Sequence, residues 1–159
     1  MKKYVVLLAL AISCLTAKAQ YNVERLITSG QVALHYEDYV LSIQYFNQVI
    51  AMKPFLYVPW QGRAAAKFYL DDFVGAEADA TEAITLNPYI DILYDLRAIA
   101  RIRQNNFAGA ILDYDKAIKL SPDTRNFWFN RAICLMNTKN YDKALAQTDS
   151  VIRKWNKLT

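Results

Sequence analysis

The sequence predicts an all-α solenoid built from four stacked pairs of antiparallel helices. The first observation is a spacing of 34 residues between similar side chains, such as Trp60, Tyr94 and Trp128. The second is the proline that ends successive periods, where a helix must stop. The third is composition: four glycines and 54% apolar side chains in 159 residues favour helices over a sheet with many tight turns. A fixed period of this length is typical of stacked repeats.

Residues 1–19 are expected to be a secretory signal peptide. The segment begins with Lys2 and Lys3, continues as an apolar run of about 13 residues, and ends in Ala17-Lys18-Ala19. The apolar run is shorter than the ~20 residues that a membrane span needs. A brief lysine-led leader is typical of bacteria, so we expect cleavage after Ala19 and export to the periplasm or the cell envelope.

Cys14 raises the alternative of a lipid anchor. The residues before it, Ala11-Ile12-Ser13, match a lipidation signal poorly. We therefore interpret Cys14 as apolar filling within the leader and expect no lipid anchor at this cysteine. Cleavage after Ala19 leaves Cys134 alone, so the mature chain has no internal disulfide and depends on packing for its stability.

Residues 20–159 are predicted to form one domain of four repeats. Each repeat has a first helix, a short polar turn and a second helix, as short antiparallel connections require. The repeats are expected at about 22–54, 55–88, 89–122 and 123–156. Their helices are expected at 21–36, 39–52, 55–70, 73–86, 89–104, 107–120, 124–138 and 141–155.

Small and large side chains recur at fixed places in the third repeat. Ala98, Ala110 and Ala117 let its two helices approach closely. Larger side chains are expected to fill the space between neighbouring pairs: Tyr94, Phe107, Tyr114 and Ile118. Because one pair cannot cover its own apolar face, the pairs must stack.

The fourth repeat departs from the pattern at its end. Asn156 stands where a proline closes the other repeats, and Trp155 and Leu158 keep this end apolar. These two side chains either fold back onto the last helix pair or form an edge that meets another chain. The second alternative predicts an accessory subunit that forms a homodimer through its C-terminal repeat.

Arginines and aspartates also recur with the repeat period, at Arg63, Arg97 and Arg131 and at Asp79 and Asp113. We interpret them as ion pairs between packed helices, because the planar guanidinium suits a carboxylate. The spacing leaves open whether each aspartate meets the arginine before it or the one after it.

The sequence contains no recognisable catalytic, metal or cofactor motif. His35 is the only histidine, and a metal site needs several converging ligands. The formal charge of +4 falls to +1 without the leader, which holds three lysines and no acid. A nearly neutral protein offers no basic surface for nucleic acid. We therefore predict no enzyme, no cofactor, no nucleic-acid partner and no stable membrane span.

The 34-residue pattern resembles the tetratricopeptide repeat (TPR) family over residues 22–156. Its usual Leu-Gly on the first helix is Arg-Ala here, as at Arg97-Ala98. The resemblance implies a right-handed solenoid that binds a protein or peptide in a concave groove lined by the first helices. Carried over by position, the groove comprises Gln31, Gln61, Ala65, Phe68, Tyr69, Ile92, Asp95, Ile99, Ile102, Arg103, Phe129, Ile133 and Met136.

The resemblance also bears on what the groove binds. Some members of the family hold a C-terminal carboxylate with Lys, Asn and Arg on this surface. The present chain has Ile27, Gln61 and Asp95 where such a clamp needs Lys or Asn. We therefore expect a scaffold or adaptor whose largely apolar groove takes an apolar or amphipathic segment, such as a helix.

Overall fold

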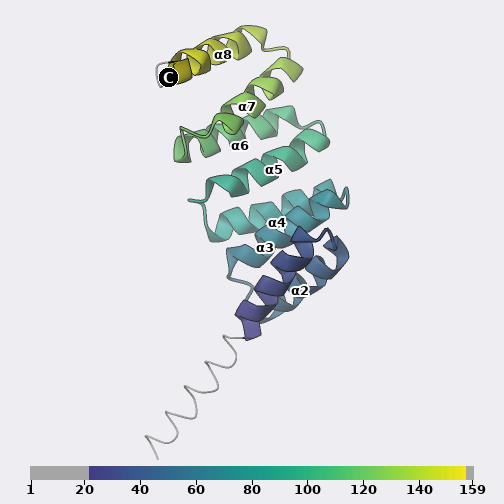
Figure 1. Ribbon diagram of the computed structural model, residues 1–159. Helices are drawn as coiled ribbons and strands as arrows, with labels where there is room; N and C mark the ends of the chain where they lie inside the picture. Colours follow the sequence, from purple (N-terminus) through teal and green to yellow (C-terminus); the bar gives the residue numbers. More distant parts are fainter. Residues whose placement is uncertain (1–21, 157–159) are drawn as a thin grey trace, which may run out of the picture.

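The computed structural model describes residues 22–156, which form eight α-helices and contain no strand. Figure 1 shows the helices stacked in chain order, each pair lying on the one before it. This arrangement confirms the predicted all-α right-handed solenoid. The helices are an unlabelled one over residues 22–35, α2 (Tyr39–Met52), α3 (Tyr57–Tyr69), α4 (Phe73–Leu86), α5 (Asp91–Arg103), α6 (Phe107–Leu120), α7 (Arg125–Asn137) and α8 (Tyr141–Asn156).

Several sequence predictions concern residues outside the described range. The leader over residues 1–19, Cys14 and Leu158 lie beyond it, and so does the side chain of Trp155. Within residues 22–156, no helix is both long and apolar enough to cross a membrane.

The turns inside the pairs share one geometry. Glu37, Asp71, Asn105 and Lys139, spaced by 34 residues, have φ values of 60–63°. In each turn the following residue donates its amide to a carbonyl five residues earlier, as in the bond from Asn106 N to Arg101 O at 2.8 Å. This bond and the left-handed residue before it define a Schellman end for the first helix.

The same turns start the second helices. The side chains of Asp38, Asp72 and Asn106 accept hydrogen bonds from backbone amides three residues later. Such caps satisfy one of the amides that a helix start leaves without a partner. Helix end and helix start are therefore encoded in two adjacent residues.

The turns between pairs are held by an aromatic residue of the next helix. The indole nitrogens of Trp60 and Trp128 donate to the carbonyls of Pro54 and Pro122, at 2.8 and 2.9 Å. The Tyr94 hydroxyl donates to Pro88 O at 3.0 Å. These bonds explain why aromatic residues recur at this place with the repeat period.

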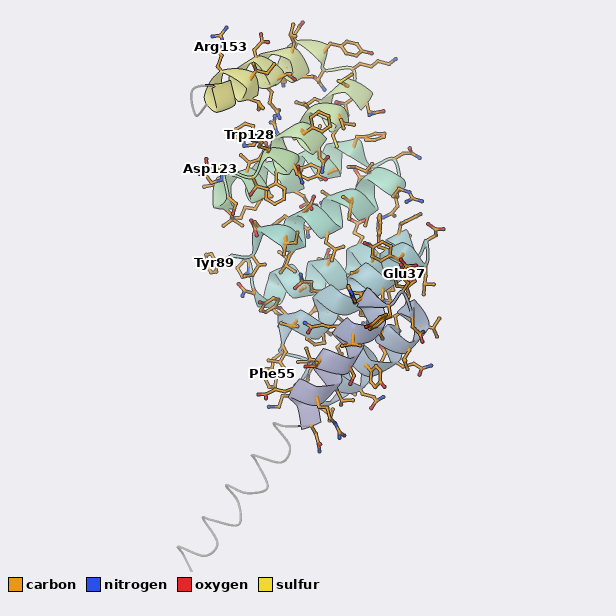
Figure 2. The ribbon with its side chains drawn as sticks, viewed as in Figure 1. Glu37, Phe55, Tyr89, Asp123, Trp128 and Arg153 are labelled. Atoms are coloured by element: carbon orange, nitrogen blue, oxygen red, sulfur yellow. The ribbon has the colours of Figure 1, made fainter. Side chains whose placement is uncertain are left out.

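The turns between pairs also change two predicted boundaries. Helices α3 and α5 begin at Tyr57 and Asp91, two residues later than predicted, because the residues after each proline belong to the turn. Phe55 and Tyr89 in these turns are exposed, at 65% and 80%. Figure 2 places both at the edge of the stack opposite Glu37.

Side-chain volumes are balanced across the junctions between pairs. Phe46 of α2 is fully buried, and a Cβ added at Gly62 of α3 would lie only 2.2 Å from its ring. At the same repeat positions in the next two junctions stand Ala80 with Leu96, and Tyr114 with Asn130. A large residue on one side thus accompanies a small or shorter one on the other, as close packing requires.

Candidate functional site

The thirteen residues predicted to line the groove all retain some access to solvent. Their role in binding stays a prediction, but their positions divide into two groups. Gln61, Ala65, Phe68, Asp95, Ile99 and Ile102 are half-buried. The exposed group comprises Gln31, Tyr69, Ile92, Arg103, Phe129, Ile133 and Met136.

A cleft of about 480 Å³ opens between the first helices of repeats one and two. On its wall, the rings of Tyr39 and Tyr69 stack 4.9 Å apart with 13° between their planes. His35 is exposed and lines the same cleft. The remaining lining residues are Gln31, Leu34, Glu37 and Ala65. This end of the predicted groove therefore offers a flat aromatic surface beside polar groups.

Arg103 at the end of α5 has partners within the chain. Its guanidinium lies 4.2 Å from the ring centre of Phe73 and 5.7 Å from that of Phe68. It also forms an exposed ion pair with Asp71 at 3.1 Å. Arg103 thus covers part of Phe68 and joins repeats two and three. It is engaged structurally at the rim of the predicted groove.

The recurring arginines and aspartates form a network that ties helices together. Arg63 binds Asp79, and Arg97 binds Asp113, so each aspartate meets the arginine sixteen residues before it. A second cation reaches each carboxylate: Lys67 reaches Asp79 at 2.8 Å, and Arg101 reaches Asp113 at the same distance. The ion-pair interpretation is confirmed for these two repeats.

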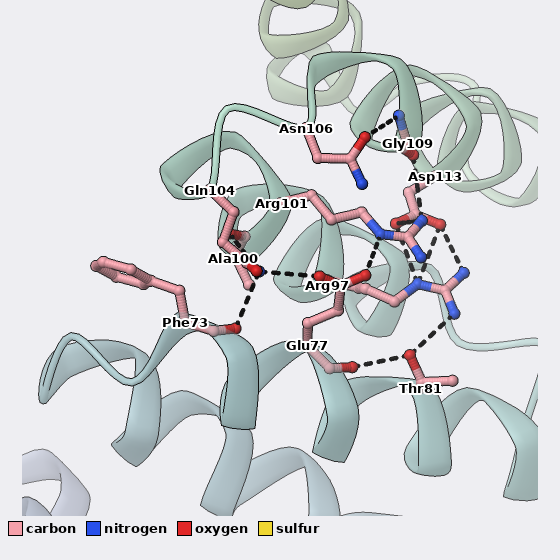
Figure 3. A network of polar contacts seen from close by, with 10 residues as sticks. All are labelled: Phe73, Glu77, Thr81, Arg97, Ala100, Arg101, Gln104, Asn106, Gly109 and Asp113. Atoms are coloured by element: carbon pink, nitrogen blue, oxygen red, sulfur yellow. Dashed lines mark hydrogen bonds and ion pairs between the residues drawn. The ribbon is translucent and has the colours of Figure 1, made fainter.

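Figure 3 shows that the network around Asp113 extends to the preceding repeat. Arg101 also binds Glu77 of α4 at 2.7 Å, and Arg97 donates to the Thr81 hydroxyl at 3.2 Å. In the fourth repeat Gln147 replaces the aspartate and accepts from Arg131, which also binds Asp115 of α6 at 2.6 Å. These ion pairs and hydrogen bonds tie neighbouring helices to one another.

Asp95 of α5 differs from these paired aspartates. One of its carboxylate oxygens is buried and has no hydrogen-bond partner. Burial and, secondarily, the nearby Asp91 raise the pKa of Asp95 above its ordinary value, and Tyr114 opposes this shift. Sequence reasoning placed Asp95 in the groove but missed its lack of a cation, because the spacing of charges did not show which aspartates are paired.

A second cavity of about 260 Å³ lies between α7 and α8 of the last repeat. Phe129 and Met136 on its wall are exposed at 68% and 55%. The other lining residues are Trp128, Ala132, Ile133, Gln147, Thr148 and Val151. The residues one period earlier include Tyr94, Ala98, Tyr114 and Ala117, which are buried next to α7. In the third repeat this surface is covered by α7. In the last repeat the equivalent surface between α7 and α8 is open to solvent.

Cys134 is buried. Burial raises the pKa of its thiol to about 11, which keeps it protonated and unreactive at neutral pH. Within the described part of the chain, no three His, Cys, Asp or Glu side chains are grouped so that they could hold a metal ion.

Comparisons with known proteins agree with this architecture. A family model described as tetratricopeptide repeat matches residues 96–157. No curated protein matches the sequence. A crystal structure of MamA protein superposes with a TM-score of 0.81 at 19% identity, covering 88% of this chain and 77% of that one.

Two further structures contain bound peptides. The first TPR domain of Spaghetti (RPAP3), bound to the HSP90 peptide SRMEEVD, has a TM-score of 0.73 at 23% identity and covers 75% of this chain and 94% of its own. The second TPR domain of human RPAP3, in complex with an HSP70 peptide, has a TM-score of 0.66 at 20% identity, with coverages of 70% and 97%. With the family model on residues 96–157 and the same fold over residues 22–156, the chain is similar to tetratricopeptide-repeat proteins.

Proposed function

We propose that the protein is a non-catalytic scaffold or adaptor that binds a peptide or helix of a partner protein in its concave groove. The observation that carries this proposal is the run of exposed apolar side chains on successive first helices. Tyr69, Ile92 and Phe129 are exposed at 59%, 45% and 68%. Apolar side chains gathered on one face of a soluble protein are typical of a binding surface.

Structural neighbours support the same use of the fold. Two of them hold short peptides of HSP90 and HSP70, and both peptides end in Glu-Glu-Val-Asp. In the present chain Ile27, Gln61 and Asp95 occupy positions where a clamp for such a carboxylate needs Lys or Asn. The proposed partner is therefore an apolar or amphipathic segment rather than an acidic C-terminus.

The proposed location is the bacterial cell envelope, reached by export. The support is the sequence of residues 1–19, with its lysines, its apolar run and the Ala17-Lys18-Ala19 ending. Mass spectrometry of the protein purified from its native host tests the proposal, since cleavage after Ala19 leaves Gln20 as the first residue. An intact leader in the cytoplasmic fraction contradicts it.

The groove is best tested at its exposed side chains. Phe68 and Ile102 are less suitable for this test, because Phe68 is half-buried and Ile102 packs against the buried cluster around Tyr114. Tyr69→Asp with Phe129→Asp changes exposed positions instead. The matched control is Val74→Asp with Leu112→Asp, exposed at 70% and 68% on second helices.

We expect the Tyr69 and Phe129 double variant to lose partner capture while its helical melting curve stays normal. Capture is measured by quantitative pull-down from the cell envelope, with the Val74 and Leu112 double variant in parallel. Equal capture by wild type and the groove variant contradicts the groove proposal, whereas loss in the control alone moves the contact to the second helices.

Self-association through the last repeat is the second candidate function. The cavity between α7 and α8 favours it, because the corresponding surface of the preceding repeat is covered by a helix. A second copy of the chain could cover this cavity, so that no other partner protein is needed. Trp155 and Leu158 were predicted to take part from sequence alone.

Thr148 allows this candidate to be tested apart from the groove. It is exposed on α8, lines the cavity and lies outside the predicted groove set. Self-association predicts a dimer by light scattering that Thr148→Glu converts to a monomer. A wild-type monomer at all concentrations contradicts this candidate.

A further inference from the structure

Asp91 and Asp95 place two carboxylates one helical turn apart on the same side of α5. Within residues 22–156, the hydrogen bond that Asp91 accepts comes from the adjacent Ile92 amide, at 2.8 Å. Neither forms an ion pair with a Lys or Arg in residues 22–156. By contrast, Asp79 and Asp113 each bind two cations. This side of α5 therefore carries two carboxylates that no Lys or Arg of residues 22–156 pairs with, and Asp91 lies in the first turn, where the helix dipole favours a negative charge.

A buried hydroxyl lies behind Asp95. Tyr114 of α6 is fully buried, and its hydroxyl lies inside the fold next to the carboxylate of Asp95. Hydrogen-bonding interactions with Asp95 and with Asn130 of α7 both affect the pKa of this hydroxyl, so the three polar groups lie next to one another. A buried polar atom that is not fully hydrogen-bonded costs free energy, so a buried group of polar atoms calls for a structural or functional explanation. Asp95, Tyr114 and Asn130 therefore form a group of polar side chains, here called the polar floor, that comes from α5, α6 and α7.

The rim around this floor is apolar. Ile92 and Ile99 lie three residues before and four residues after Asp95, so they share its side of α5. One period later, Phe129 of α7 takes the position that Asp95 has on α5, and it is exposed at 68%. A carboxylate between aliphatic and aromatic side chains suits a lysine or arginine, whose stem packs on apolar surface while its charged end reaches the acid.

We propose that Asp95 is the selectivity site of the groove and receives a lysine or arginine side chain of the bound peptide, with apolar residues on either side of that cation. The proposal rests on the groove function proposed above. An incoming cation supplies the counter-charge that the other recurring aspartates obtain from within the chain. Pairing with a peptide cation is favourable for Asp95, because a partly buried carboxylate without a counter-charge costs free energy.

The same site disfavours acidic peptides. A ligand carboxylate over α5 meets Asp91 and Asp95 at close range, and like charges there repel one another. The nearest exposed cation on α5, Arg103, is held by Asp71 and by the rings of Phe68 and Phe73. Charge complementarity therefore selects for a cation and against an anion in the ligand.

A random peptide library displayed on phage tests the proposal with three forms of residues 20–159: wild type, Asp95→Asn and Asp142→Asn. Asp142 is an exposed carboxylate in the first turn of α8 and serves as the matched control. We expect wild type and Asp142→Asn to enrich peptides with Lys or Arg at one fixed place between apolar residues. Asp95→Asn is expected to enrich apolar peptides without that cation.

A synthetic peptide from the selection then gives the size of the effect. Exchange of its cation for norleucine is expected to weaken binding to wild type by about tenfold or more, as for other partly buried charge pairs. The same exchange is expected to leave binding to Asp95→Asn nearly unchanged. Isothermal titration calorimetry measures both affinities.

The outcomes separate the two proposals. Enriched peptides without a cation preference, or with acidic residues, overturn the role of Asp95 and leave the groove intact. Peptides that bind wild type and the Tyr69→Asp, Phe129→Asp variant equally overturn the groove itself, and the role of Asp95 with it. A cation preference that survives in Asp95→Asn assigns the selectivity to another residue and contradicts the inference.

Discussion

Arg97 on α5 grips Asp113 on α6 through two guanidinium nitrogens, with its Nη2 atom 2.6 Å from Oδ1 and its Nε atom 3.1 Å from Oδ2. The carboxylate is almost fully buried, at 2% exposure, and Arg101 binds it as well. Removal of the acid therefore leaves two largely buried guanidinium groups without their main counter-charge. The ion pair therefore connects the two helices of the third repeat, α5 and α6.

Asp113→Ala is expected to lower the free energy of unfolding by about 3–5 kcal/mol, the usual cost of breaking a buried ion pair from one side. Asp115→Ala is the matched control. Asp115 also binds an arginine, Arg131, but its side chain is 48% exposed. The control is expected to cost less than about 1 kcal/mol, because solvent screens exposed pairs. Urea unfolding of both variants decides the comparison, and equal losses contradict the structural role of the buried pair.

The junction between α2 and α3 predicts a clash. A Cβ at Gly62 would lie 2.2 Å from the ring of the fully buried Phe46. We expect Gly62→Ala to destabilise the protein by about 1–3 kcal/mol, as overpacked cores do. The usual helix-stabilising effect of a Gly-to-Ala change is outweighed here.

A double-mutant cycle identifies the cause of this loss. Phe46→Leu is expected to be destabilising alone but to cost much less in the Gly62→Ala background, because the smaller side chain makes room for the added methyl group. Thermal unfolding gives the four stabilities. Additive effects of the two changes show that Phe46 and Gly62 do not compete for space.

The turns before α6 and α8 adopt the same left-handed geometry with different residues. Asn105 and Lys139 both have φ at 60°. A lysine pays a steric cost there that asparagine partly avoids and glycine does not incur. Lys139→Gly is therefore expected to raise the free energy of unfolding by about 0.5–1 kcal/mol, and Asn105→Gly to change it less. Chemical denaturation checks both, and destabilisation by Lys139→Gly contradicts the predicted strain.

The sequence was sufficient for the fold because the repeat uses the same few devices each time. A period of 34 residues, the prolines and the recurring alanines predicted the helix pairs and their stacking. The starts of α3 and α5 were placed two residues too early, since Phe55 and Tyr89 are not residue types that mark a turn. The hydrogen bonds from Trp60, Tyr94 and Trp128 set those starts, and they depend on three-dimensional reach.

The candidate site was less predictable, since its properties come from neighbours on other helices. Position within the repeat placed Asp95 on the concave side. Its missing counter-charge depends on where Arg97 and Arg101 point, and both point to Asp113. The sequence held one signal of this site. Tyr114 and Asn130 are polar, whereas the residues 34 positions earlier, Ala80 and Leu96, are apolar.

The last prediction concerns the pH dependence of stability at Asp95. Burial, with a smaller effect of Asp91, raises the pKa of its carboxyl in the folded protein above 3.8, its ordinary value. The folded state thus holds this proton more tightly than the unfolded chain. Its contribution to the free energy of unfolding is full below the unfolded pKa and is lost as pH rises through the folded pKa.

Asp95→Asn removes this ionisation and is expected to stabilise the peptide-free protein by about 1 kcal/mol at pH 7, the low end of the cost of an uncompensated polar group. The gain should shrink as pH falls, because the wild-type Asp95 carboxyl takes up its proton at a higher pH than an ordinary aspartate does. Asp142→Asn, at the exposed start of α8, should instead lose a little stability at pH 7, because a negative charge is favourable at a helix N-terminus. Urea unfolding of the three proteins at pH 7 and pH 4 measures these differences. A loss of stability in Asp95→Asn at pH 7 would show that the ionised carboxylate is already compensated within the fold.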